Sequence, residues 1–314
     1  MTNHNIEQAK QNRDVKIEKA KTLLSEAVGK LQSGDEWKAM LANLARGGRF
    51  SLRRLSFRNQ LLVQMQAPGA TSVATYASWQ NGGRQVRKGE KALTILAPII
   101  IKKATAENSA DETDSKLVGF RPMATFAGGQ TDPMSGDAGR PLPEPVSITK
   151  NIEAEEAFES SVETLQAVAL GLGTSVVSGV ELRPRQAGDL PAAHGWFELK
   201  KKGIVVITGE TSRAQQFKTL VHEIAHALLH GGEEHHDRPE MEVEAESTAF
   251  VVSSVLGLET GGYSFPYVAS WANEKNAQAM VLQSGQRIVK ATNKILDALF
   301  AAFETEEHDV RVAA

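Results

Sequence analysis

The sequence predicts an α+β protein of two domains, and three observations lead to that prediction. The chain has 314 residues, which is enough for two domains of ordinary size. Residues 132–148, DPMSGDAGRPLPEPVSI, are rich in Pro, Gly and Asp and are typical of a linker. Charge is also divided unevenly along the chain. We therefore expect an N-terminal α+β domain over residues 1–131 and a C-terminal domain over residues 149–314.

The net charge of −3 conceals two parts of opposite sign. Residues 41–104 contain 11 Lys and Arg against the single acid Glu90, a net charge of +10. Residues 1–40 contribute +1, so residues 105–314 carry −14. A cationic surface is therefore expected on the N-terminal domain and an anionic surface on the C-terminal domain.

The composition excludes several classes of protein. The chain contains no cysteine, which excludes a disulfide framework and any thiolate metal site. The longest apolar run, near ALTILAPIII, is far shorter than a membrane span, and the first residues lack the apolar segment of a signal peptide. We expect a soluble, cytoplasmic protein with no membrane partner.

The N-terminal domain is expected to begin with helices. The first covers residues 6–31, and the second covers DEWKAMLANLA at 35–45, with Asp35 as its N-cap. The third covers SFRNQLLVQMQ at 56–66 and ends at the Ala-Pro-Gly turn that follows.

Strands are expected in the rest of this domain. The glycines at 82–83 and 89 mark turns. Residues 92–103, ALTILAPIIIKK, contain a continuous apolar run with several β-branched residues, which predicts a buried strand. Residues 116–126, KLVGFRPMATF, show an alternating side-chain pattern that is typical of a strand. This strand is predicted to pair with residues 92–103 after the polar loop SADETDS.

The C-terminal domain is expected to alternate helices with a strand-rich stretch. A helix over 155–173 precedes strands that end in KKGIVVITGE at 201–210. Ser212 and Gln215 have the spacing of a capping box before the helix RAQQFKTLVHEIAHALLH, which Gly231 and Gly232 end. Two more helices are expected, at about 240–256 and 276–303.

An HExxH motif, formed by His222, Glu223 and His226, lies on the capped helix of the C-terminal domain. Histidines four residues apart on a helix point the same way, so both imidazoles can bind one cation. Glu223 lies beside them and can take a proton from water, as the base of a metallopeptidase does. Zinc is the expected ion, with another divalent metal as the alternative. The context predicts a zincin-like domain.

The third metal ligand is expected from the acidic helix EMEVEAESTAFVVSSVL. Glu246 follows His226 by 20 residues, which is the spacing of gluzincins, and it is the preferred ligand. Glu242 shares its helix face and is the alternative, whereas Glu244 points to the other side. A metzincin would need Gly at 229 and His at 232, where this chain has Leu229 and Gly232, so that class is excluded.

Several neighbouring residues have roles that the sequence leaves open. His230 is interpreted as a helix-end residue near the metal, and the loop residues His235 and His236 as solvated. Tyr263, Tyr267 and Arg238 are candidates for stabilising an oxyanion. The strand GIVVITGE at 203–210 could pair with an extended peptide substrate. The alternative to catalysis is a metal held only for structure.

The cationic region combines basic side chains with aromatic and amide side chains. Basic residues with aromatic platforms suit single strands, because unpaired bases are free to stack. Amides and guanidinium groups add donors for phosphates and base edges. The candidate DNA contacts are Arg53, Arg54, Arg58, Asn59, Gln60, Gln66, Trp79, Arg84, Arg87, Lys88 and Lys91.

Both parts of the chain resemble the ArdC-type antirestriction proteins of conjugative plasmids and other mobile elements. In the first part the similarity lies in FRNQLLVQMQAPGATSV, SWQNGGRQVRKGEKALTILAP and FRPMATFAGGQTD. In the second it lies in TLVHEIAHALLH, EVEAES and YVASWANE. The resemblance implies a basic domain that binds single-stranded DNA, a zincin-like metallopeptidase domain, and protection of incoming DNA from host restriction.

Two alternatives are compatible with the same residues. The first is an active zinc metalloprotease that cleaves a host or element-encoded regulatory protein and uses DNA binding for targeting. The second is a DNA-binding accessory factor for replication or transfer, with a structural metal. A host restriction enzyme or a peptide substrate would be the protein partner.

Overall fold

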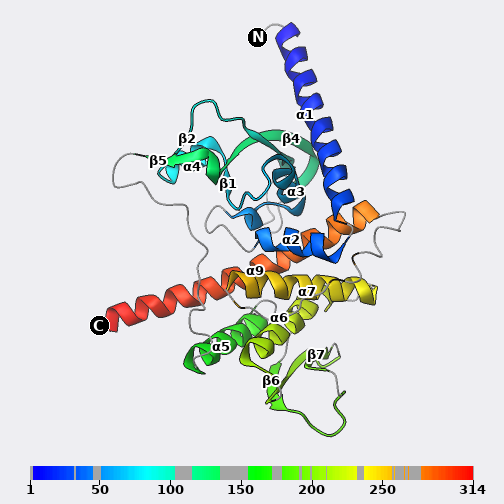
Figure 1. The fold of residues 1–314 in the computed structure, drawn as a ribbon, viewed down its shortest axis with the longest axis vertical. Helices are drawn as coiled ribbons and strands as arrows, with labels where there is room; N and C mark the ends of the chain where they lie inside the picture. Colours follow the sequence, from blue (N-terminus) through cyan, green and yellow to red (C-terminus); the bar gives the residue numbers. More distant parts are fainter. Residues whose placement is uncertain are drawn as a thin grey trace, which may run out of the picture. The chain divides into compact units, whose positions relative to one another are not determined.

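The computed structural model forms two compact units (Figure 1). The first contains Met1–Gly29 and Arg49–Pro143, and the second contains Lys30–Gly48 and Glu144–Ala314. The residues that the structure describes are 3–31, 33–44, 51–102, 115–134, 155–171, 179–190, 193–198, 200–209, 211–231, 237–256, 258, 265, 268 and 277–313. Among them, no helix combines the length and the apolar character that crossing a membrane requires.

The first unit combines helices with two small antiparallel sheets. Its helical segments are α1 (Asn3–Lys30), η2 (Leu52–Arg54), α3 (Phe57–Gln66), α4 (Tyr76–Asn81) and η3 (Gly128–Gln130). Its strands are β1 (Val73–Ala74), β2 (Arg84–Val86), β3 (Leu93–Lys102), β4 (Ser115–Ala127) and β5 (Thr131–Pro133). The strand order is β1-β4-β3 in one sheet and β2-β5 in the other. The predicted hairpin of β3 and β4 is therefore present, and its polar loop lies outside the described residues.

Side chains of α3 hydrogen-bond the open edge of β3. The Asn59 amide donates to the carbonyl of Leu96 at 3.0 Å and accepts from its N–H at 2.9 Å. Gln66 forms the same pair with Thr94, with both distances at 2.9 Å. Strand residues two apart present their main-chain groups to the same edge, so the two amides replace a neighbouring strand there. This pairing fixes α3 on the sheet.

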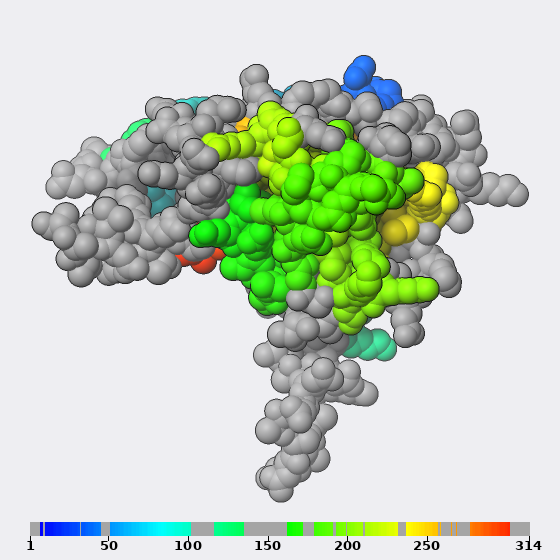
Figure 2. Space-filling model, turned by 90° about the horizontal axis from the view of Figure 1, so that it is seen from below, coloured from blue at the N-terminus to red at the C-terminus, as the bar shows by residue number. Residues whose placement is uncertain are grey.

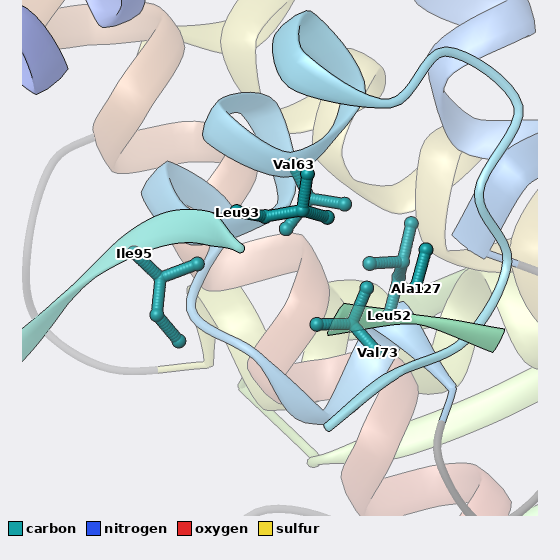
Figure 3. Close-up of a cluster of buried hydrophobic side chains, with 6 residues drawn as sticks. All are labelled: Leu52, Val63, Val73, Leu93, Ile95 and Ala127. Carbon is teal, nitrogen blue, oxygen red and sulfur yellow. The ribbon is translucent and has the colours of Figure 1, made fainter. Parts of the chain in front are cut away.

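The core of the first unit lies between η2, α3 and the ends of β1, β3 and β4. Figure 3 shows the cluster, which places Val63 beside Leu93 and Val73 beside Leu52 and Ala127. Its members are buried to 7% exposure or less. Trp79 is also fully buried, and its indole N–H donates to the carbonyl of Phe126 at 2.9 Å.

The second half of β3 differs from the predicted buried strand. Leu93 and Ile95 are buried, but Ile100 and Ile101 are each 56% exposed. The facing residue Leu117 on β4 is 53% exposed. The amides of α3 bond only to the first half of the strand, so the ribbon of β3 and β4 continues beyond the helix. An apolar run alone therefore predicted the strand correctly and its burial only in part.

The second unit places helices against a three-stranded sheet. Its helices are α2 (Gly34–Leu44), α5 (Glu155–Gly171), α6 (Arg213–His230), α7 (Arg238–Val255) and α9 (Ala277–Ala313). Its strands are β6 (Gly179–Pro184), β7 (Gly195–Glu198) and β8 (Gly203–Thr208), in the order β6-β8-β7. β6 runs parallel to β8, and β7 runs antiparallel to it. α6 packs against β7, β8 and α7, and α7 packs against α9.

Helix α2 belongs to the second unit, although the sequence placed it with the basic domain. Trp37 is fully buried, and its indole N–H donates to the Ser247 hydroxyl of α7 at 2.8 Å. The predicted cap at Asp35 is wrong. Ser33 and Glu36 form the reciprocal pair of a capping box instead, because the Ser33 hydroxyl accepts from the Glu36 N–H while the Glu36 carboxylate accepts from Ser33. The α+β class is confirmed in both units.

Candidate metal centre and candidate nucleic-acid surface

Helix α6 carries the HExxH motif and is held firmly at its N-terminus. The Ser212 hydroxyl accepts from the Gln215 N–H, as its spacing predicted. Apolar residues along one face of the helix, Phe217, Leu220 and Ile224, are fully buried. This packing fixes the direction in which His222 and His226 project.

Three ligand atoms from α6 and α7 converge. The Nε2 atoms of His222 and His226 are 3.0 Å apart. A carboxylate oxygen of Glu242 lies 3.5 Å from the first and 3.7 Å from the second. Among the described residues, this trio forms the one group of His and acidic side chains close enough to share a metal ion.

The separations fit a divalent cation in tetrahedral coordination. Metal–ligand bonds of about 2.0–2.2 Å place neighbouring ligand atoms about 3.3–3.6 Å apart. The observed separations of 3.0, 3.5 and 3.7 Å lie within about 0.3 Å of that range. Two imidazoles and one carboxylate leave a fourth position, which is the arrangement of catalytic rather than structural zinc sites.

Glu242, the alternative third ligand, supplies the carboxylate oxygen that lies near both Nε2 atoms, whereas the preferred ligand Glu246 lies beside Nδ1 of His222. One Glu246 oxygen accepts from Nδ1 of His222 at 3.2 Å, on the side of the ring away from His226. Its other oxygen accepts from Lys218 Nζ at 2.8 Å. A carboxylate on Nδ1 holds the ring in the tautomer that presents Nε2 as a lone pair. Glu246 therefore orients His222.

Electrostatics couple these groups strongly. Burial lowers the pKa of His222, but hydrogen bonds to Glu242 and Glu246 outweigh burial and raise the pKa to about 9. The two imidazoles hold the pKa of Glu242 well below its usual range. Burial raises the pKa of Glu223, although the neighbouring histidines oppose the shift. A raised pKa suits a carboxylate that takes and returns a proton near neutral pH.

Glu223 lies at the wall of a pocket of about 640 Å³. The pocket is lined by the two histidines, by Glu242 and by β7, and Trp196 and Met241 give it apolar surface. The main-chain N–H of Phe197 donates to the Glu223 carboxylate. The pocket volume lies within the usual range for small-ligand and substrate sites, about 300–1,000 Å³.

Strand β7 meets α6 at a glycine. A Cβ on Gly195 would lie 2.6 Å from Cγ2 of Thr219 and 2.7 Å from the carbonyl oxygen of Val205. Only glycine lets the strand approach the helix this closely, one helical turn before Glu223. Sequence reasoning missed this contact, since no pattern marks Gly195 apart from the other glycines of the chain.

β6 and β7 are the two edge strands of the described sheet, and β7 is the one that lines the pocket. β8, predicted to pair with a peptide, is central and bonds to β6 on one side and β7 on the other, so that prediction is wrong. The continuous apolar run of β8 is typical of such a central strand. Figure 2 looks onto the segment that carries β6 and β7, which forms much of the visible green surface.

Other residues singled out in the sequence lie as follows. His230 is buried on α6, with its ring centroid 5.6 Å from that of His226 and its Nε2 atom 3.7 Å from a Glu244 oxygen. Arg238, a candidate oxyanion group, lines the pocket. The remaining candidates, Tyr263, Tyr267, His235 and His236, lie outside the described residues.

The candidate DNA contacts divide into buried and exposed groups. Buried residues with bonds inside the unit act in its folding, and Arg84 illustrates this, since its guanidinium donates to the Thr131 hydroxyl and carbonyl at 2.8 Å each. The residues at 7% exposure or less are Arg53, Asn59, Gln60, Trp79 and Arg84. Gln66 is half-buried and bonded to β3. The exposed cations are Arg54, Arg58, Arg87, Lys88 and Lys91.

Two family models match separate stretches of the chain. The N-terminal domain of the anti-restriction factor ArdC matches residues 20–127. The IrrE N-terminal-like domain, a peptidase family, matches residues 179–258, which include the HExxH helix and Glu242.

Individual proteins also resemble the chain. An uncharacterized protein of Bacillus anthracis is 25% identical over 253 residues, which is 70% of this chain but 41% of that protein. The metal-free crystal structure of the antirestriction protein ArdC from plasmid R388 is 18% identical with a TM-score of 0.46, over 79% of this chain and 86% of that one. Its Mn(II)-bound structure is 19% identical with a TM-score of 0.44, over 78% and 85%.

Proposed function

Since the chain resembles ArdC-type antirestriction proteins in both of its domains, we propose that it binds single-stranded DNA and protects incoming DNA from host restriction. The order of an ArdC N-terminal domain and a peptidase-like domain in one chain carries this proposal. Such a protein acts during transfer of a mobile element such as a conjugative plasmid, inside the recipient cell.

The charge of the N-terminal domain supports the DNA-binding part of the proposal. Residues 41–104 carry +10, and the exposed cations Arg54, Arg58, Lys88 and Lys91 belong to this segment. Cations of this density attract a phosphate backbone whatever its sequence, because binding releases condensed counterions. The buried residues Trp79, Asn59 and Arg84 are left out of the proposed interface.

In the second unit we propose a zinc site held by His222, His226 and Glu242, with Glu246 orienting His222. A divalent ion bound there supplies a Lewis acid that polarises a carbonyl and lowers the pKa of water. The chemistry of the donor set favours zinc, since two imidazoles and a carboxylate suit it better than magnesium or calcium.

A second function, peptide hydrolysis, is favoured by the position of Glu223. The carboxylate lies in the pocket beside both histidines and takes a proton from the attacking water, then returns it to the leaving nitrogen. The free edge of β7 can pair with an extended peptide, and Trp196 and Met241 offer apolar contact. A host or element-encoded regulatory protein is the proposed substrate class.

Restriction protection by Glu223→Ala separates the two functions. The variant and the wild type are compared in cells that carry a restriction system, with Glu163→Ala, an exposed residue of α5, as the matched control. Zinc content and DNA binding of the purified proteins are measured alongside. The substitution removes the base and leaves the three proposed ligands.

Each outcome decides one part of the proposal. Protection by Glu223→Ala at the wild-type level means that hydrolysis is not the mechanism, and the metal then serves structure. Loss of protection with zinc and DNA binding intact means that peptide cleavage is required. A wild type that gives no protection and binds no single-stranded DNA would overturn the antirestriction proposal itself.

A further inference from the structure

A second pocket lies in the first unit, between α4, β2 and the turn after β2. Its volume is about 560 Å³. Tyr76 and Phe126 supply aromatic walls, with ring centroids 6.4 Å apart and planes at 72°. The Gln85 amide donates to the Tyr76 hydroxyl and to the carbonyl of Val86. The pocket is therefore built by side chains whose positions are fixed by one another.

The charges in this pocket are balanced. Arg87 donates to Glu90 at 2.8 Å and to Asp132 at 3.2 Å, and it also donates to the carbonyl of Gly129. Gln130 holds the second oxygen of Glu90 at 3.0 Å. Because the guanidinium is already paired with two carboxylates, a phosphate would meet two negative charges here. The pocket therefore suits an uncharged, planar, polar group better than an anion.

Tyr76 is the more exposed of the two aromatic residues that line the pocket. It is 43% exposed, whereas Trp79, one helical turn away, is fully buried. Thr75 caps α4 by accepting from the Ser78 N–H, which fixes the backbone at Tyr76. An exposed aromatic ring on a fixed backbone can stack on a base at little cost in conformational entropy.

Exposed cations stand at the rim of the pocket. Arg87, Lys88, Gly89 and Glu90 form a turn in which the Glu90 N–H donates to the Arg87 carbonyl and Gly89 has a φ of +88°. This turn places Lys88 at the pocket edge, and Lys91 follows it. A strand whose base entered the pocket would have a phosphate near Lys88, and Lys91 lies three residues further along the chain.

We propose that this pocket takes one unpaired nucleobase of a bound DNA strand, stacked on Tyr76, while Lys88 and Lys91 hold the flanking phosphates. The inference rests on the proposed binding of single-stranded DNA and adds the site at which a base is recognised. The carboxylate of Asp132 and the amide oxygen of Gln85 line the same pocket and offer acceptors to the base edge.

The test compares two strands of equal length, an oligothymidylate and an abasic strand with the same phosphates, by fluorescence anisotropy with the whole chain. Tyr76→Ala should weaken binding of oligothymidylate about 5- to 150-fold, the usual range for one stacked base. It should leave binding of the abasic strand unchanged, and Tyr76→Phe should keep the wild-type affinity for both. Lys91→Ala should weaken both strands equally.

The results distinguish the pocket from DNA binding as a whole. If wild type binds both strands with a steep salt dependence but Tyr76→Ala binds oligothymidylate as wild type does, the pocket proposal is overturned and DNA binding stands. Equal losses on both strands would also overturn it, because they would indicate a damaged fold. If wild type binds neither strand at low salt, the proposed function and the pocket fall together.

Discussion

At the scale of single residues, the two glutamates of α7 near the HExxH motif have different tasks. An oxygen of Glu242 lies within 3.7 Å of both Nε2 atoms, whereas Glu246 contacts Nδ1 of His222 and Lys218. We expect Glu242→Gln to lower zinc affinity by more than 100-fold, because it removes a charged ligand. Glu246→Gln should lower it by about 10- to 100-fold, as loss of an orienting partner usually does.

Isothermal titration calorimetry with zinc and with manganese measures the metal affinity of both variants. Glu181→Gln, an exposed acid of β6, is the control and should bind as wild type does. A larger loss in Glu246→Gln than in Glu242→Gln would restore Glu246 as the ligand and contradict the observed geometry.

The protonation of His222 sets the pH dependence of metal binding. In the metal-free protein its pKa is raised from 6.5 to about 9, so the ring is charged at neutral pH. The resulting stabilisation of the fold is complete below pH 6.5 and is lost as the pH rises through about 9. A bound metal must displace that proton, so affinity should rise about tenfold per pH unit between about pH 7 and pH 9.

Titrations in buffers of different ionisation enthalpy count the protons released. One proton should leave per metal bound at about pH 7, and none above the pKa of His222. An affinity that stays flat across this interval would mean that His222 is already neutral in the metal-free protein.

At the scale of elements, α9 packs against α7, and Arg287 is one of the side chains that join the two helices. Arg287 donates to the fully buried Glu244 at 2.8 Å and also to Glu240. It therefore contacts α7 two residues before and two residues after Glu242. Burial raises the pKa of Glu244, and Arg287 opposes that shift. Arg287→Met should lower the free energy of unfolding by about 3 kcal/mol, because a buried carboxyl loses its partner. Glu244 can take up a proton instead, which keeps the loss at the lower end of the usual range.

Urea unfolding with and without zinc measures this effect. Lys290→Met, an exposed site on the same helix, is the control and should change little. Zinc affinity should fall together with stability in Arg287→Met, because Glu242 loses its fixed position. Stability equal to that of the control would show that α7 is held by its apolar face alone.

The elements were largely predictable from sequence, because their signals are local. Capping at Ser212, the turns at Gly83 and Gly89, and the periodicity of α3 and α6 each lie within a few residues. What the sequence could not supply depends on where one helix crosses another. The choice between Glu242 and Glu246, one turn apart on α7, is decided by that crossing. The burial of Trp79 and Asn59 is likewise decided by β3 and β4, far along the chain.

At the scale of the whole molecule, two segments of opposite charge separate two tasks. Residues 41–104 carry +10, and residues 105–314 carry −14. The acidic part repels a phosphate backbone, so a bound strand should be confined to the basic part. A whole-chain pI of 6.3 conceals this division.

The salt dependence of DNA binding tests this division of charge. Replacing Arg54, Arg58, Lys88 and Lys91 by alanine should reduce the slope of log K against log salt by about 0.7 for each phosphate that these side chains neutralise. A control with the same change in charge replaces four exposed lysines outside residues 41–104, namely Lys10, Lys19, Lys200 and Lys290. That control should keep the wild-type slope, because its lysines lie outside the proposed interface. Equal slopes in the two variants would mean that net charge alone governs binding and that no localised surface exists.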